Sequence, residues 1–224
     1  LLSSNLFKDI SKYVSKKDVY YCPNGIPKIE ITKETNTFKT YKLPQLLFLS
    51  NLIESKGVYI LLEALRLVKN HGLEFHCNLV GGEGDISIIE LNARIKSLKL
   101  ENHVSYLGKK YEIEKYNIYN SSDYFIFPTY YHNECFPLVL LEAMMFELPI
   151  ISTNEGGIPD IVKNGITGFI VDKQNPKHLA EKIIYFIENP TKAKFMGKQG
   201  RKKFIKNYTL EVFEKRLLEI LNRI

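Results

Sequence analysis

The strongest constraint on the fold is a regular alternation between short apolar runs and longer stretches with helical periodicity. The apolar runs are rich in β-branched and aromatic residues and are mostly continuous, as strands buried on both faces of a parallel sheet are. Strands that alternate with helices in this way are typical of an α/β domain. The predicted strands are residues 19–22, 46–50, 75–80, 104–107, 124–127, 150–152 and 169–171.

Helical periodicity is clearest in residues 57–69, where Leu61, Leu62, Leu65 and Val68 fall on one face. The remaining stretches between predicted strands also have the length and composition of helices. These predicted helices are residues 86–98, 113–120, 138–146, 158–162 and 176–187, and two more close the chain at 193–205 and 210–221.

The last predicted helix has a broad apolar stripe and follows Thr209, a suitable N-cap. We expect residues 1–207 to form one Rossmann-like domain with a doubly wound parallel sheet. Residues 208–224 then form a C-terminal helical tail, expected to pack on a part of the protein that this chain lacks. The polar stretch 27–44 is predicted to be a surface loop or insertion.

The 224 residues, 45% of them apolar, suffice for one domain with a hydrophobic core. No apolar run approaches the ~18 residues of a membrane-spanning helix, and the first seven residues lack the pattern of a signal peptide. The chain is therefore expected to be soluble and cytoplasmic. It does not begin with Met, so we expect that residue 1 is not the natural start.

The net charge of +6 raises the question of a nucleic-acid partner. Lysines greatly outnumber arginines and the aromatic residues do not interleave with basic ones, so we predict no nucleic-acid binding. Residues 192–206 contain seven basic residues and no acidic one. A solvated helix face is the favoured interpretation, and peripheral contact with an anionic surface, such as the inner face of a membrane, is the alternative.

The metal-binding residue types do not form a recognisable site. Cys22, Cys77 and Cys135 are far apart, which predicts neither a disulfide framework nor a zinc site. The five histidines lack metal-ligand spacing, and no Asp-x-Asp pair is present. We therefore predict that no metal is required.

Two loops after predicted strands have residues suited to phosphate. Lys56 lies at the start of a helix, where free backbone amides and the helix dipole favour an anion; a solvated first turn is the alternative. The stretch 81–84 reads G-G-E-G, and it lacks the third glycine of a dinucleotide fingerprint and the Lys-Ser/Thr of a P-loop. NAD and P-loop chemistry are thus disfavoured.

The richest stretch is residues 128–149. Pro137 suits the first turn of a helix, so Glu134 belongs to the preceding loop and Glu142 to the helix itself. Free amides at Leu138 and Val139 would form an anion site. The Glu142 carboxylate could accept hydrogen bonds from two adjacent hydroxyls, as in a ribose, or could form a structural cap or ion pair.

Taken in order, these stretches resemble the C-terminal, donor-binding half of retaining glycosyltransferases with the GT-B fold, especially glycosyltransferase family 4. The resemblance spans nearly the whole chain. Its landmarks are residues 23–26 (P-N-G-I), 50–57 (S-N-L-I-E-S-K-G), 80–84 (V-G-G-E-G), 104–108 (V-S-Y-L-G), 134–142 (a Glu-x7-Glu motif), 156–160 (G-G-I-P-D) and 164–168 (N-G-I-T-G).

The resemblance implies transfer of a sugar from a UDP- or GDP-sugar to an acceptor hydroxyl with retention of anomeric configuration, in bacterial cell-surface glycan synthesis. Lys56 and Glu134 are the implied catalytic residues: Lys56 would hold the diphosphate, and Glu134 would contact the transferred sugar. Glu142 would bind the ribose. The other implied donor-binding residues are Asn51, Gly82, Tyr106, Leu107, Cys135, Phe136, Leu138 and Val139. The acceptor, a glycan or a lipid-linked saccharide, would be bound mainly by an absent N-terminal half.

Three positions depart from the family pattern. Asn51 stands where the family usually has an arginine, which weakens the predicted charge at the diphosphate. Cys135 and Glu147 replace usual glycines. Because of Asn51, a catalytically weak module that binds a nucleotide sugar stays open as an alternative. A GT-B-like sugar-nucleotide epimerase is a second alternative.

Overall fold

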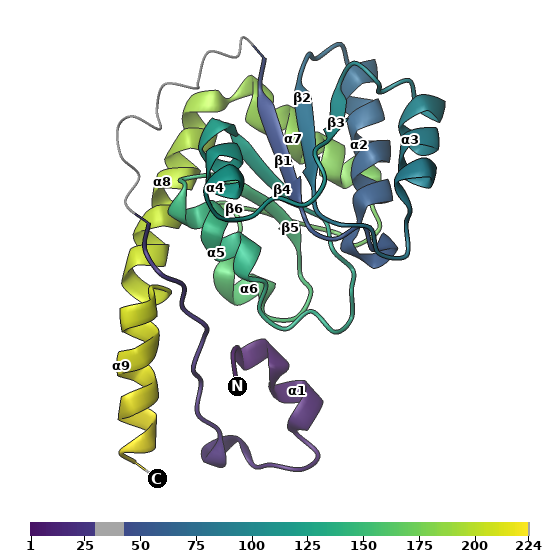
Figure 1. Cartoon of the computed structure of the whole chain (residues 1–224). Helices are drawn as coiled ribbons and strands as arrows, with labels where there is room; N and C mark the ends of the chain where they lie inside the picture. Colours follow the sequence, from purple (N-terminus) through teal and green to yellow (C-terminus); the bar gives the residue numbers. More distant parts are fainter. Residues whose placement is uncertain (30–42, 224) are drawn as a thin grey trace.

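The computed structural model describes residues 1–29 and 43–223, and its centre is a six-stranded parallel sheet (Figure 1). The strand order is β3-β2-β1-β4-β5-β6, which is the doubly wound order predicted from the alternation of strands and helices. The strands are β1 (Gln45–Leu49), β2 (His76–Val80), β3 (Val104–Tyr106), β4 (Tyr124–Phe127), β5 (Ile150–Thr153) and β6 (Gly168–Val171).

Helices cover both faces of the sheet, and their predicted bounds are confirmed to within three residues (Figure 1). The long helices are α2 (Val58–Asn70), α3 (Ile88–Ser97), α4 (Glu112–Ser121), α5 (Leu138–Met145), α7 (Pro176–Glu188), α8 (Pro190–Asn207) and α9 (Leu210–Leu221). The short ones are α1 (Phe7–Ile10), α6 (Ile158–Ile161) and the 3-10 helices η1 (Ser4–Leu6), η2 (Lys16–Asp18) and η4 (Glu54–Lys56).

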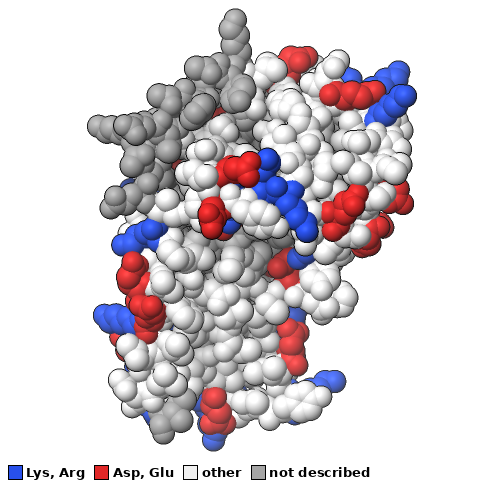
Figure 2. All heavy atoms as spheres, viewed as in Figure 1, with Lys and Arg blue, Asp and Glu red and all other residues white. Residues whose placement is uncertain are grey.

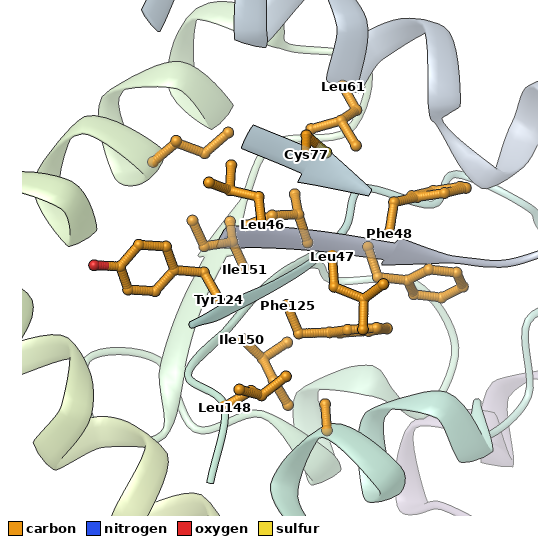
Figure 3. Close-up of a cluster of buried hydrophobic side chains, with 14 of the residues drawn as sticks. Leu46, Leu47, Phe48, Leu61, Cys77, Tyr124, Phe125, Leu148, Ile150 and Ile151 are labelled. Carbon is orange, nitrogen blue, oxygen red and sulfur yellow. The ribbon is translucent and has the colours of Figure 1, made fainter. Parts of the chain in front are cut away.

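The core lies on both sides of the two central strands, β1 and β4. Leu46, Leu47 and Phe48 of β1 are completely buried, as is Phe125 of β4 (Figure 3). Buried side chains such as Leu61 of α2 close the core above the sheet. Continuous apolar strands are thus buried on both faces. The parallel pairing of β1 with β4 places their carboxyl ends side by side.

The predicted strand at residues 19–22 is wrong. This segment is extended, and the Cys22 amide donates to the Leu1 carbonyl at 2.8 Å, but the segment joins no sheet. Its apolar side chains instead face a groove shared with Leu217 and Ile220 of α9. The apolar run that predicted a strand therefore lies beside a helix and not in the sheet. Most of the predicted loop at 27–44 lies outside the described residues.

Residues 1–22 and α9 extend below the sheet in Figure 1, and we call them together the terminal lobe. The predicted cap of α9 is confirmed, since the Thr209 side chain accepts from the Val212 amide. No residue of α9 is buried. The Ser3 hydroxyl donates to the Asp160 carboxylate at 2.6 Å, which ties the lobe to α6. Within the described residues, no helix is long and apolar enough to cross a membrane.

Buried tyrosines make the stability of the fold sensitive to alkali. Burial, with the Asp123 carboxylate as a second cause, raises the pKa of Tyr124 to about 12 from an ordinary value near 10. The folded state therefore keeps this proton at a pH where the unfolded chain loses it, so stability falls as pH rises from about 10 to 12. We expect Tyr124→Phe to flatten this fall by up to about 1.4 kcal/mol per pH unit.

Urea unfolding at a series of alkaline pH values measures this slope. Tyr13, which is 84% exposed, provides the matched control. Tyr13→Phe is expected to leave the slope unchanged, and equal slopes in the wild type and Tyr124→Phe would contradict the assignment.

Candidate functional site

The order of the strands identifies one place where a ligand is expected. The chain runs outward from β1 to β3 and then returns to β4, so the loops after β1 and β4 part at a topological switch point. These loops are bonded to each other, since the Tyr130 amide donates to the Ser55 carbonyl at 2.7 Å and the Thr129 hydroxyl to the same oxygen at 3.3 Å. These two hydrogen bonds hold the loops after β1 and β4 together at the switch point.

Lys56 and Glu134 meet at this switch point. The Lys56 Nζ lies 2.6 Å from the Glu134 Oε2, and the two side chains are only 15% and 10% exposed. The Lys56 Nζ also lies 4.3 Å from the centroid of the Tyr131 ring. Lys56 ends η4 and is followed by Gly57 and then by α2, so it lies at the start of a helix as predicted. Two residues that are 78 positions apart therefore form one charged pair.

A third loop, after β5, packs against Glu134 through Gly156. A Cβ atom at Gly156 would lie 1.5 Å from the Glu134 carbonyl oxygen, and its φ of +48° also disfavours side chains. The close approach of this loop holds the Glu134 backbone in place. An open cavity of about 370 Å³ lies here, lined by Leu6, Lys8, Asp9, His132, Asn133, Glu134, Cys135, Glu155 and Gly156.

We expect Gly156→Ala to lower the free energy of unfolding by about 2 kcal/mol more than Gly72→Ala does. Gly72 has a φ of +90° and no heavy atom within 4 Å of a Cβ, so it matches the backbone strain without the steric clash. Urea denaturation of both variants provides the comparison. Equal destabilisation would show that the contact with Glu134 does not restrict the loop.

Glu142 is held by two side chains of α4. Its Oε1 lies 2.6 Å from the Lys115 Nζ, and its Oε2 accepts from the Tyr119 hydroxyl at 2.9 Å. Burial, reinforced by the Glu142 charge, raises the pKa of Tyr119, so its hydroxyl stays protonated and donates. The structural ion pair predicted as an alternative is present. A carboxylate accepts about four hydrogen bonds, so this pairing leaves capacity for two more.

The remaining predicted residues lie along the same edge of the sheet. The Asn51 Oδ1 accepts from the Gly82 amide at 3.2 Å, and the Tyr106 hydroxyl donates to the Gly81 carbonyl at 2.8 Å. Leu107 is partly buried beside the core. These hydrogen bonds link the carboxyl ends of β1, β2 and β3 along this edge of the sheet.

At the start of α5 the predicted residues differ in exposure. Cys135 is exposed and lines the cavity, whereas the Phe136 side chain is only 5% exposed and packs edge-on against Tyr208. Leu138 is 44% exposed and Val139 packs partly against the core. A ligand could therefore contact Phe136 through its backbone but not through its buried side chain.

Sequence reasoning missed three side chains near this edge. Lys109 lies across Gly82, because a Cβ there would lie 2.0 Å from the Lys109 Cε. Lys115 and Tyr119 hold Glu142, and their i, i+4 spacing on α4 was the available signal. A larger hollow, of about 530 Å³, lies at the amino ends of β4 and β5 and contains none of the predicted site residues.

The described residues contain no group of three or more His, Cys, Asp or Glu side chains placed to hold a metal ion. Independence from metal stays a prediction.

Comparison with known proteins decides the family. The family model described as "Glycosyl transferases group 1" matches residues 29–203, which is most of the chain. The chain belongs to this family of glycosyltransferases. Its α/β fold, with a six-stranded parallel sheet and a C-terminal helical tail, is that of the GT-B glycosyltransferases.

Several curated glycosyltransferases are similar to this chain in sequence. The capsular polysaccharide biosynthesis glycosyltransferase CapM of Staphylococcus aureus is 28% identical over 175 residues, which are 78% of this chain and 45% of CapM. The putative colanic acid biosynthesis glycosyltransferase WcaL of Escherichia coli is 26% identical over 182 residues, 79% of this chain and 44% of WcaL. The chain thus spans about half the length of the curated relatives it matches.

Solved glycosyltransferase structures share the fold. Anabaena Alr3699/HepE in complex with UDP superposes with a TM-score of 0.84 at 22% identity, covering 96% of this chain and 60% of that one. TarM superposes with a TM-score of 0.81 at 20% identity, covering 99% of this chain and 42% of TarM.

Proposed function

We propose that this chain binds the nucleotide-diphosphate sugar donor of a retaining glycosyltransferase of family 4 and, with a further part of the protein, transfers the sugar to an acceptor hydroxyl. The observation that carries the proposal is the Lys56–Glu134 pair at the switch point of the sheet. Membership of a glycosyltransferase family makes a sugar nucleotide the expected ligand there. Retention follows from the resemblance of the Glu-x7-Glu stretch.

The charge at the switch point suits the diphosphate of such a donor. The leaving nucleotide departs with two negative charges, and a preorganised cation stabilises this charge as it develops. Lys56 is such a cation, and the first turn of α2 adds the positive end of a helix dipole. In this arrangement Lys56 exchanges its contact with Glu134 for the diphosphate, and Glu134 becomes available to hydroxyls of the transferred sugar.

We infer that the nucleotide is a uridine diphosphate. HepE was crystallised with UDP and with UDP-glucose, and TarM with UDP. Tyr106 and Leu107 would flank the base and Glu142 would accept from the ribose hydroxyls. No divalent metal is included in this proposal.

The acceptor is proposed to be a glycan or a lipid-linked saccharide. CapM and WcaL are named for the biosynthesis of capsular polysaccharide and colanic acid. We propose that the terminal lobe contacts the part of the protein that binds this acceptor, since Leu217, Leu218 and Leu221 of α9 are 38 to 60% exposed. The chain by itself should therefore bind donor and transfer little sugar.

A thermal-shift screen with nucleoside diphosphates and their sugars tests the donor proposal. A ligand at one hundred times its Kd adds ~2.7 kcal/mol of stability, which raises the Tm of a domain of this size by roughly 5–10 °C. UDP or a UDP-sugar is expected to produce this shift, and adenosine and inorganic phosphate are not. The proposal fails if no nucleoside diphosphate raises the Tm.

A further inference from the structure

The basic residues of α8 fall into two groups, two that bond to the rest of the fold and five that are exposed to solvent. Arg201 donates to the Met145 carbonyl at the end of α5, and Lys203 donates to the Ile161 carbonyl at the end of α6 at 2.8 Å. These two side chains cap helix ends inside the fold. The remaining five are exposed and point outward: Lys192, Lys194, Lys198, Lys202 and Lys206.

The outward lysines are not neutralised by neighbours. The 18 residues of α8 include no acidic residue, and within the described part of the chain none of the five forms an ion pair. The five outward lysines carry a charge of +5, close to the net charge of +6 of the whole chain. By contrast, basic and acidic side chains lie intermixed on the face drawn in Figure 2. The unbalanced positive charge is therefore concentrated on α8.

Apolar side chains lie within this basic face. Phe195 is 61% exposed, and it shares one side of α8 with Lys198, Lys202 and Lys206 because these positions recur every three or four residues. Ile205 is 48% exposed at the flank. An open groove of about 360 Å³ beside Phe195 is lined by Gly165, Tyr185, Thr191, Lys192 and Met196. Solvation of a helix does not require such a groove.

We propose that the outward face of α8 docks on an anionic lipid bilayer. Lysines would contact the headgroup phosphates while Phe195 and Ile205 enter the boundary with the acyl chains, as on an interfacial amphipathic helix. An RNA partner fits less well, because the five outward cations are all lysines and Phe195 is the single exposed aromatic residue of α8. This surface shares no residue with the donor site.

The packing of α8 relates this surface to the donor site. A Cβ at Gly197 would lie 1.8 Å from the Glu147 carbonyl, so α8 lies tightly against the end of α5. The other end of α5 begins at Leu138, in the candidate site. Docking of α8 would thereby hold the donor site at a fixed distance from the bilayer.

Vesicle co-sedimentation tests the proposal on the chain itself. We expect the chain to bind vesicles of phosphatidylcholine mixed with phosphatidylglycerol, and not pure phosphatidylcholine, at ~0.15 M salt. Lys194→Glu/Lys198→Glu/Lys202→Glu should reduce this partitioning roughly 100-fold or more. Phe195→Ser should reduce it roughly tenfold without any change in charge.

Lys12→Glu/Lys16→Glu/Lys17→Glu is the matched control, because these exposed lysines lie in the terminal lobe and give the same change in net charge. It should retain most of the binding, and far-ultraviolet circular dichroism should show all variants folded. Equal loss in both triple variants would overturn the proposal, as would absence of binding to anionic vesicles or tighter binding to an RNA oligonucleotide.

Discussion

Lys56→Ala is expected to weaken the binding of UDP by this chain roughly 1000-fold, or about 4 kcal/mol. The substitution removes charge-assisted hydrogen bonds to the diphosphate. It also leaves the Glu134 carboxylate, which is 10% exposed, without its cation beside the incoming negative charge. Isothermal titration calorimetry of the wild type and the variant measures the change.

Two further variants separate these effects. Lys56→Ala/Glu134→Gln removes both charges, so we expect it to regain thermal stability and part, but not all, of the affinity for UDP. Lys12→Ala removes an exposed lysine of the terminal lobe and should leave the affinity unchanged. If the double variant binds UDP as tightly as the wild type, Lys56 serves only to neutralise Glu134 and the assignment to the diphosphate is wrong.

Glu142→Ala is expected to abolish discrimination between UDP and 2′,3′-dideoxy-UDP. In the wild type, two hydrogen bonds from the ribose to a carboxylate should favour UDP roughly 200-fold, or about 3 kcal/mol. The variant should bind both nucleotides with the same low affinity. Competition titration with the two nucleotides gives the ratio.

Lys115→Met is the control for a purely structural role of Glu142. It breaks the 2.6 Å ion pair while the Tyr119 hydroxyl still orients the carboxylate, so the preference for UDP should persist. A Glu142→Ala variant that loses affinity for both nucleotides but keeps the preference would show that Glu142 stabilises the fold and does not touch the ribose.

The elements that the sequence predicted well are those with an unambiguous local pattern. Residues 124–127 are a continuous apolar run between turns, and β4 has these bounds. Residues 19–22 have a similar composition, but the strand predicted there is wrong. An apolar run indicates that its side chains will be buried, but it does not indicate whether they pack within a sheet or against a helix. The contact with α9 depends on residues almost 200 positions away.

The sequence indicated Lys56 and Glu134 as candidate site residues but did not indicate that they pair. The strand order brings Lys56 and Glu134 together, and no local pattern shows that they form an ion pair. The sequence of residues 192–206 likewise does not distinguish one basic residue from another. In the structure Arg201 and Lys203 cap α5 and α6. That division follows from the packing of neighbouring helices, which sequence spacing does not specify.

The most direct test of the account is a crystal structure of this chain with bound UDP. We predict the diphosphate at the switch point between β1 and β4, with the Lys56 Nζ within hydrogen-bonding distance of a phosphate oxygen and Glu142 bonded to the ribose. A nucleotide bound elsewhere, with the 2.6 Å contact between Lys56 and Glu134 intact, would contradict the account.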